Sequence, residues 1–89
     1  MNTILSEETT AKVQDILIDQ LGVGRDQITP DAKIMEDLGA DSLDMVDIGM
    51  TVEETFNLSI SDDDMENVHT AGDLHQALAG VLERTGQPV

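Results

Sequence analysis

The sequence predicts an all-α protein: a small bundle of three longer helices plus one short helix, with a long loop between the first and second helices. Two observations lead to this prediction. Apolar residues recur at the three- and four-residue spacing of amphipathic helices, and no stretch shows the alternation or the hairpin turn of paired strands. The chain of 89 residues has the size of one domain, residues 1–89. Phe56 is its only aromatic residue, so the core must be aliphatic.

The first helix is expected to begin after Ser6 and to end at Gly22. Ser6 can cap it, and Glu7 and Glu8 occupy the first turn, where the helix dipole favours acids. Its apolar stripe comprises Val13, Ile16, Leu17 and Leu21. Gly22 can take the left-handed conformation that often ends a helix.

Between Gly22 and Asp41 lies a connection of about twenty residues, a length that is unusual in a compact domain. It contains Pro30, and one short turn is expected after this residue. Four apolar side chains are expected to attach the loop to the core: Ile28, Ile34, Met35 and Leu38.

The second helix is expected to have Asp41 as its cap, Ser42 as its first residue and an end near Phe56. At about 100° per residue it has two apolar stripes, whereas an ordinary surface helix has one. One stripe comprises Met45, Ile48, Val52 and Phe56, and the roughly opposite face comprises Leu43, Val46, Asp47, Met50 and Glu54. The second stripe predicts a docking face with an apolar centre and an acidic rim. A more deeply buried helix is the alternative, although its acids make full burial costly.

A short third helix is expected within residues 62–68, with Met65 and Val68 facing inward. Thr70 can cap a fourth helix. The apolar stripe of this last helix comprises Leu74, Ala77, Leu78, Val81 and Leu82. Residues 84–89 are expected to form a flexible tail.

The net charge is −15, from nineteen acidic and four basic residues. This charge argues against nucleic acid as a partner and favours partners with basic surfaces; an acidic surface that only confers solubility is the alternative. No segment is long enough to span a bilayer, and the N-terminal residues have neither the basic flank nor the apolar run of a signal peptide. A monomeric, cytoplasmic protein without membrane insertion is therefore expected.

Ser42 is expected to be exposed at the start of the second helix. A nucleophilic serine needs a base within reach, but His69 and His75 are distant in sequence and are expected to be surface residues. The surroundings of Ser42 also differ from the Gly-x-Ser-x-Gly elbow of hydrolases. Ser42 is therefore predicted to be a residue that is acted upon, and a phosphate there would meet free backbone N–H groups and the positive end of the helix dipole. An ordinary helix-start serine is the alternative on local grounds.

A run of three acids, residues 62–64, raises the question of calcium. It lacks the alternating oxygen ligands, central glycine and closing glutamate of a calcium loop, so a solvated acidic turn is predicted and no metal site is expected. An acidic ion-binding or inhibitor protein without a prosthetic group is the competing hypothesis from another functional class.

Residues 37–44, Asp-Leu-Gly-Ala-Asp-Ser-Leu-Asp, resemble the prosthetic-group attachment motif of acyl carrier proteins, especially the free-standing bacterial type used in fatty-acid synthesis. The similarity covers nearly the whole chain and includes "QLGV" and "VEETFNLSISDDDMENVHT". It implies that Ser42 receives phosphopantetheine from coenzyme A through the action of a separate magnesium-dependent transferase. The protein would then be a carrier and not an enzyme, with acyl groups held as thioesters on the terminal thiol of the arm.

The resemblance also implies the partners: a phosphopantetheinyl transferase, acyltransferases, ketosynthases and other acyl-processing enzymes with basic docking surfaces. The expected partner-binding residues are Asp41, Leu43, Asp44, Val46, Asp47, Met50, Glu53 and Glu54. The acyl chain would be sheltered between the helices, and the candidates to line its pocket are Met45, Ile48, Gly49, Val52 and Phe56.

Three positions depart from the pattern of the family. Gly49 stands where a bulky aliphatic residue is usual, Thr51 where alanine is frequent, and Met45 where the smaller threonine is often found. These departures leave a specialised carrier for a modified-lipid or polyketide pathway as the alternative to a fatty-acid carrier. At Gly49, either the backbone of another segment packs closely or the missing side chain widens the acyl pocket.

Overall fold

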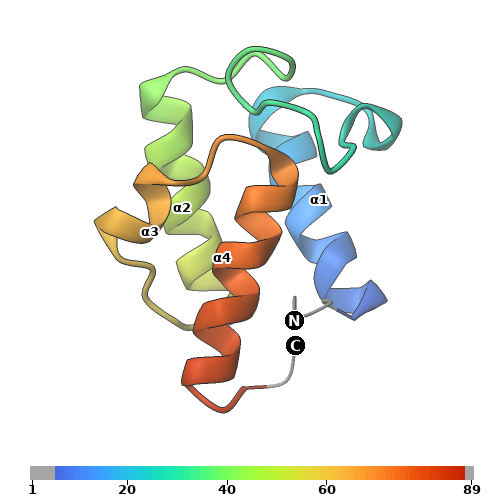
Figure 1. Cartoon of the computed structure of the whole chain (residues 1–89). Helices are drawn as coiled ribbons and strands as arrows, with labels where there is room; N and C mark the ends of the chain where they lie inside the picture. The colour runs from blue at the N-terminus through green and yellow to red at the C-terminus, as the bar shows by residue number, and fades with distance from the viewer. Residues whose placement is uncertain (1–5, 88–89) are drawn as a thin grey trace.

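The computed structural model describes residues 6–87, which form four α-helices and one 3₁₀ helix. In chain order these are α1 (Glu7–Leu21), η1 (Arg25–Gln27), α2 (Ser42–Phe56), α3 (Asp62–Glu66) and α4 (Ala71–Arg84). The long helices α1, α2 and α4 pack as a bundle, the short α3 lies beside α2, and the long loop crosses one end (Figure 1). The predicted all-α architecture is confirmed.

Capping side chains set the ends of α1 where the sequence predicted them. The hydroxyl of Ser6 accepts a hydrogen bond from the N–H of Thr9 at 3.2 Å. At the other end, Gly22 is left-handed with a φ of 69°, and its N–H donates to the carbonyl of Ile18 at 2.8 Å. Each cap satisfies backbone groups that the helix itself leaves without partners.

At the start of α4, Thr70 and Asp73 form a reciprocal pair of caps. The Thr70 hydroxyl accepts a hydrogen bond from the N–H of Asp73 at 3.1 Å. The Asp73 carboxylate accepts from the N–H groups of His69 and Thr70 at 3.0 and 3.1 Å. These hydrogen bonds, that from His69 foremost, lower the pKa of the Asp73 carboxyl because they favour its charged form.

The C-terminal end of α4 extends slightly further than expected. Arg84 is the last residue of the helix and not the first residue of a tail. The N–H of Gln87 donates to the carbonyl of Leu82 at 2.9 Å, which folds residues 85–87 back against the last turn. Residues 88–89, the rest of the predicted tail, lie outside the described part of the chain.

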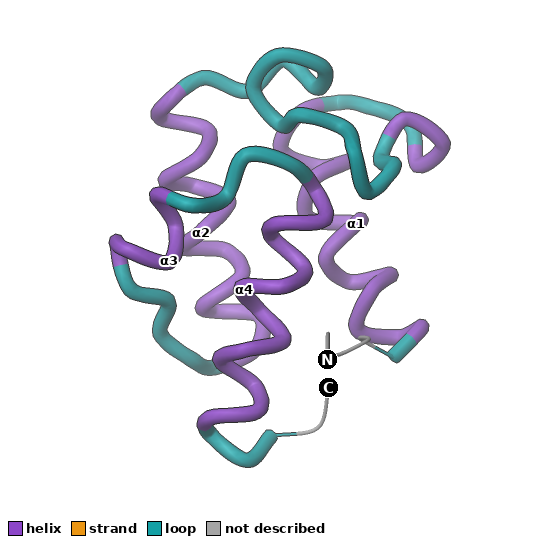
Figure 2. The backbone as a smooth tube through the Cα atoms, viewed as in Figure 1, coloured by secondary structure: helices purple, strands orange, loops and turns teal. Residues whose placement is uncertain are grey.

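The loop between α1 and α2 passes over one end of the bundle (Figure 2). Three of the four side chains expected to anchor it are buried. Ile28, Ile34 and Leu38 are buried, but Met35 is 48% exposed, so the prediction was wrong for this residue. The reason is a helical turn over residues 33–38. Residues four apart in such a turn share a face, so Ile34 and Leu38 face inward and their neighbour Met35 faces outward. The 3₁₀ helix η1, before Pro30, was not predicted.

The core is aliphatic, and every long helix contributes to it. Burial of each such side chain removes apolar surface from water and stabilises the fold by about 1.5–3 kcal/mol. The largest fully buried side chains are Leu17, Ile34, Ile48, Leu74, Leu78, Leu82, Val13 and Val52. The predicted stripe of α4 is confirmed, with Ala77 at its partly buried edge.

His75 differs from the expected surface histidine, whereas His69 is exposed as predicted. His75 is half-buried, and its Nε2 atom is buried without a hydrogen-bond partner. It lies one turn after Ala71 and one turn before Ala79, both of which are buried, so it borders the apolar face of α4. Burial lowers the pKa of its imidazole because desolvation disfavours the charged form.

Candidate functional site

Ser42 lies at the exposed start of α2, as the sequence predicted. Its hydroxyl has no hydrogen-bond partner within residues 6–87. The cap before it is a reciprocal pair: the Asp41 carboxylate accepts from the N–H of Asp44 at 2.8 Å, and the Asp44 carboxylate accepts from the N–H of Asp41 at 3.1 Å. Because the neighbouring acids are used by the backbone, the Ser42 hydroxyl is left free for another molecule.

The second stripe of α2 is exposed, which excludes the alternative of a deeply buried helix. Leu43 is 74% exposed, Val46 59% and Met50 53%. Together with Met35, these are the large apolar side chains that stand out from the described surface. Exposed apolar side chains that cluster on one helix face indicate an interaction surface.

The exposed acids beside this stripe have no basic partner. All four basic residues of the chain form their ion pairs with acids outside α2. These pairs are Lys12–Glu8, Arg25–Asp15, Lys33–Glu36 and Arg84–Asp64. The charges of Asp47 and Glu54 are therefore uncompensated within the described chain, so they are available to attract a basic surface.

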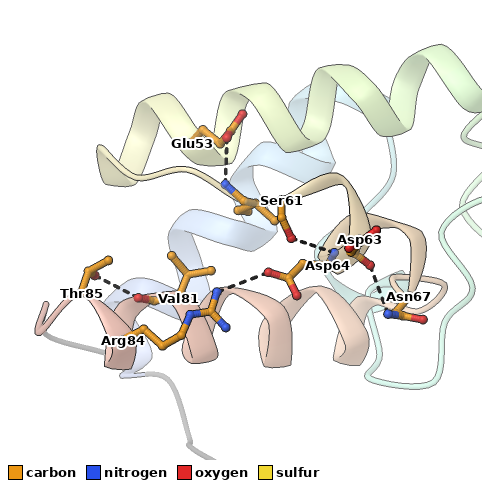
Figure 3. Close-up of polar contacts among 9 residues, drawn as sticks. Glu53, Ser61, Asp63, Asp64, Asn67, Val81, Arg84 and Thr85 are labelled. Atoms are coloured by element: carbon orange, nitrogen blue, oxygen red, sulfur yellow. Dashed lines mark hydrogen bonds and ion pairs between the residues drawn. The ribbon is translucent and has the colours of Figure 1, made fainter.

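Two other acids of α2 have structural partners that sequence reasoning missed. The Glu53 carboxylate accepts a hydrogen bond from the N–H of Ile60 at 2.8 Å and so fixes the loop that leads into α3 (Figure 3). The Asp44 carboxylate accepts from the side-chain amide of Gln20, on α1, at 3.3 Å. Both carboxylates therefore connect α2 to its neighbours in addition to lying near its outer face.

A cavity of about 330 Å³ lies between α2 and α3. Its lining residues are Met45, Val46, Gly49, Met50, Glu53, Ile60, Asp62, Met65 and Glu66. Of the candidates for the acyl pocket, Met45 and Gly49 belong to this lining. Ile48 and Val52 are fully buried in the core, and Phe56 is partly buried against it, so none of these three lines the cavity.

The neighbour of Gly49 is the side chain of Met65. A Cβ atom built on Gly49 would lie 3.2 Å from Cε, 3.5 Å from Sδ and 3.8 Å from Cγ of Met65, and these are the three nearest atoms. Of the two alternatives for Gly49, close packing of backbone from another segment is therefore wrong. The missing side chain provides space beside the cavity, and a flexible methionine occupies it.

Within residues 6–87, no cluster of three or more histidine, aspartate or glutamate side chains could hold a metal ion. The acids at 62–64 instead form the first turn of α3, where the helix dipole favours them, and Ser61 caps the N–H of Asp64 at 3.1 Å. None of the described helices combines the length and the apolar character needed to cross a membrane.

Comparison with known proteins gives consistent results. The family model for the phosphopantetheine attachment site matches residues 11–84. A curated relative, the acyl carrier protein of Syntrophobacter fumaroxidans (strain DSM 10017 / MPOB), is 47% identical over 68 residues, which are 76% of this chain and 84% of that protein.

Two solved structures share the fold. The acyl carrier protein from Enterococcus faecalis, described for its high thermal stability, matches with a TM-score of 0.74 and 29% identity over 88% of this chain and 99% of that one. A putative acyl carrier protein from Anaplasma phagocytophilum matches with a TM-score of 0.75 and 32% identity over 90% of this chain and 94% of that one.

Proposed function

The chain belongs to the phosphopantetheine-carrying family of acyl carrier proteins, and on this basis we propose that Ser42 is the residue to which the phosphopantetheine is attached. One observation supports this assignment above the others: among the serines, Ser42 has an exposed hydroxyl, without a partner, at the start of a long helix. Ser6 and Ser61 use their hydroxyls as helix caps. Ser59 is exposed but lies in the loop between α2 and α3.

The local structure around Ser42 fits a phosphodiester. The backbone N–H groups of Ser42 and Leu43 are at the open end of α2, where the positive end of the helix dipole also favours a phosphate. The Asp41 cap fixes the start of the helix and therefore the position of the Ser42 Oγ atom. Phosphopantetheine supplies a terminal thiol, on which acyl groups are carried as thioesters. The chain itself contains no cysteine.

The face of α2 formed by Leu43, Val46, Asp47, Met50 and Glu54 is proposed to dock the enzymes that load and process the acyl groups. Its exposed apolar centre can be buried by a partner, and its unpaired acids favour a basic rim on that partner. A phosphopantetheinyl transferase, acyltransferases and ketosynthases are partners of this kind. Asp41 lies beside the face. Asp44 and Glu53 contribute less to docking than the acids without partners, because their carboxylates already accept hydrogen bonds within the protein.

Fatty-acid synthesis is the function that the family supports for this carrier. A specialised lipid or polyketide pathway would use the same serine and the same arm. The two pathways would differ in the acyl groups that the cavity accepts.

The attachment site is tested by intact-mass measurement after treatment with coenzyme A and a broad-specificity transferase. The wild type should gain the mass of one phosphopantetheine, and Ser42→Ala should gain none. Ser59→Ala is the matched control and should load like the wild type. Because Asp41 supplies the cap, Ser42→Ala should keep the helical circular-dichroism spectrum of the wild type. Loading of Ser42→Ala would refute the assignment.

The docking face is tested by the rate of loading at low and high salt. Glu54→Lys on α2 should lower kcat/KM of the transferase and weaken its salt dependence, because the attraction between opposite charges is lost. Asp19→Lys makes the same change of charge at an exposed position of α1 and should have little effect. Equal rates for the two variants would contradict a docking role for this face of α2.

A further inference from the structure

Met65 occupies the space that Gly49 leaves open, and both residues line the cavity between α2 and α3. We propose that Met65 is a movable plug, and that the combined size of residues 49 and 65 sets the length of the acyl chain that the cavity shelters. The inference rests on the proposed function, because the acyl chain is tethered to Ser42 through the phosphopantetheine arm.

The position of the cavity along α2 suits an acyl chain whose phosphopantetheine arm is attached at Ser42. Met45 and Gly49 are three and seven residues after the serine, so all three positions lie on one side of the helix. By helix geometry, Gly49 is about 10 Å further along α2 than Ser42. The lining therefore begins one turn after the attachment point and continues to the glycine.

The chemistry of the lining favours an uncharged alkyl chain. Its methionines, together with Val46 and Ile60, present flexible or aliphatic surface. Three carboxylate residues complete the lining, Glu53, Asp62 and Glu66. They would disfavour a cargo that ends in a second carboxylate, because like charges repel at short range.

Met65 can move more easily than the residues of the core. It is only partly buried, and an unbranched thioether side chain has several accessible rotamers. The helix that carries it, α3, has five residues, none of which is buried. As Figure 3 shows, α3 is held by polar contacts: the Ser61 cap, a hydrogen bond from Asn67 to Asp63, and an exposed ion pair between Arg84 and Asp64. The exposed ion pair contributes little to stability, and the cap and the Asn67 hydrogen bond contribute about 1 kcal/mol each.

Residues 49 and 65 offer a test in which side-chain volume is transferred from one position to the other while the total stays nearly constant. Gly49→Val adds roughly the side-chain volume that Met65→Ala removes, about three methylene-sized groups. If the two residues share one space, each single variant should shift the capacity of the cavity in the opposite direction. The double variant Gly49→Val/Met65→Ala should then restore the capacity of the wild type.

Two measurements report how well the cavity shelters the acyl chain. Each protein is loaded from a series of saturated acyl-coenzyme A substrates of increasing length, and the product is verified by intact mass. The melting temperature is compared with that of the unacylated form, and thioester cleavage by hydroxylamine is timed. Each methylene that leaves the cavity for water should shift the equilibrium between sheltered and exposed chain roughly fourfold. Cleavage should accelerate accordingly for chains beyond the capacity of the cavity.

In the wild type, protection of the thioester from hydroxylamine should increase with the length of the acyl chain and then level off. The length at which it levels off should be about three methylenes greater in Met65→Ala and about three smaller in Gly49→Val. Met65→Leu conserves volume and should retain the wild-type limit. The same limit in Met65→Ala and Met65→Leu would overturn the inference, and this pair decides the question even if Gly49→Val does not fold. A failure of Ser42 to gain mass would refute the proposed function, whereas loading with an unchanged limit refutes only the role of Met65.

Discussion

Three glycines in the long helices have different neighbours, so alanine at each should change stability by a different amount. A Cβ atom on Gly80, in α4, would meet no atom within 4 Å apart from its chain neighbours and the backbone of its own helix. On Gly49, in α2, it would lie 3.2 Å from the terminal carbon of Met65. On Gly72, in the first turn of α4, it would lie 2.9 Å from the backbone carbonyl oxygen of Pro30.

Gly80→Ala should gain the full stabilisation that alanine gives over glycine in a helix. Alanine is favoured over glycine in a helix interior by about 1 kcal/mol, which corresponds to roughly 4–8 °C in the melting temperature of a domain of this size. Gly49→Ala has the same intrinsic gain, but the end of the Met65 side chain must first move by a few tenths of an ångström. Since that end is flexible and borders a cavity, the variant should still be stabilised, by roughly half a kcal/mol.

Gly72→Ala should be destabilised. The N–H of this glycine donates to the carbonyl of Pro30 at 2.9 Å, so the backbones of α4 and the loop are held together at the point where a Cβ would intrude. Backbone cannot move aside as a side chain does, and overpacking of this kind costs about 1–3 kcal/mol. From the most to the least stable, the expected order is therefore Gly80→Ala, Gly49→Ala, wild type and Gly72→Ala.

Urea unfolding followed by far-ultraviolet circular dichroism measures this order. The helical signal is the suitable probe because the chain has no tryptophan or tyrosine. All proteins should be measured without phosphopantetheine, so that occupancy of the cavity does not contribute. A Gly49→Ala variant less stable than the wild type would show that Met65 cannot move, and it would refute the reasoning about both the glycine and the plug.

Three further predictions concern single groups and the overall charge. Because the folded state lowers the pKa of His75 below its usual value of 6.5, the unfolded chain binds its proton more readily, so the free energy of unfolding should fall as the pH decreases from about 7 to 5. His75→Leu should flatten this slope in urea titrations, and an unchanged slope would contradict the assignment to His75. Glu53→Ala leaves the N–H of Ile60 without its acceptor and should cost about 1–3 kcal/mol, whereas Glu54→Ala, at an exposed position, should change stability by less than about 0.5 kcal/mol; similar losses would show that the hydrogen bond is unimportant. Potassium chloride should raise the melting temperature, because it screens the repulsion within a chain of net charge −15, and a falling melting temperature would contradict this.

The helix ends could be predicted from the sequence because their signals are local. The caps at Ser6, Asp41 and Thr70 each act on a backbone N–H group three residues later. The two stripes of α2 could likewise be predicted from the sequence, since helical periodicity alone separates the buried Ile48 from the exposed Val46. These features need no knowledge of which elements pack together.

The cavity could be predicted only in part, because it depends on contacts between segments that are separated in sequence. Met65 packs beside Gly49, and Ile60 joins the lining of the same cavity, only after the loop between α2 and α3 has folded back. The Glu53 carboxylate that fixes this loop acts across seven residues. No local pattern signals such a contact. The partial burial of His75 was missed for the same reason, since it depends on how the edge of α4 is packed. The exposure of Met35 was missed because it depends on the local helical turn over residues 33–38, which turns Met35 outward.

The two sides of α2 are packed differently, and this difference connects the proposed attachment site to the cavity. On one side, Ile48 and Val52 are fully buried in the core, which holds the helix and therefore Ser42 in place. On the side of the cavity, the partner is α3, a helix without a buried residue. Gly49 would be unfavourable for an isolated helix, and such local conflicts tend to occur at functional positions. The proposed attachment point is thus held by the core, and the cavity beside it is bounded by a short helix without a buried residue, which suits a carrier of acyl chains of different lengths.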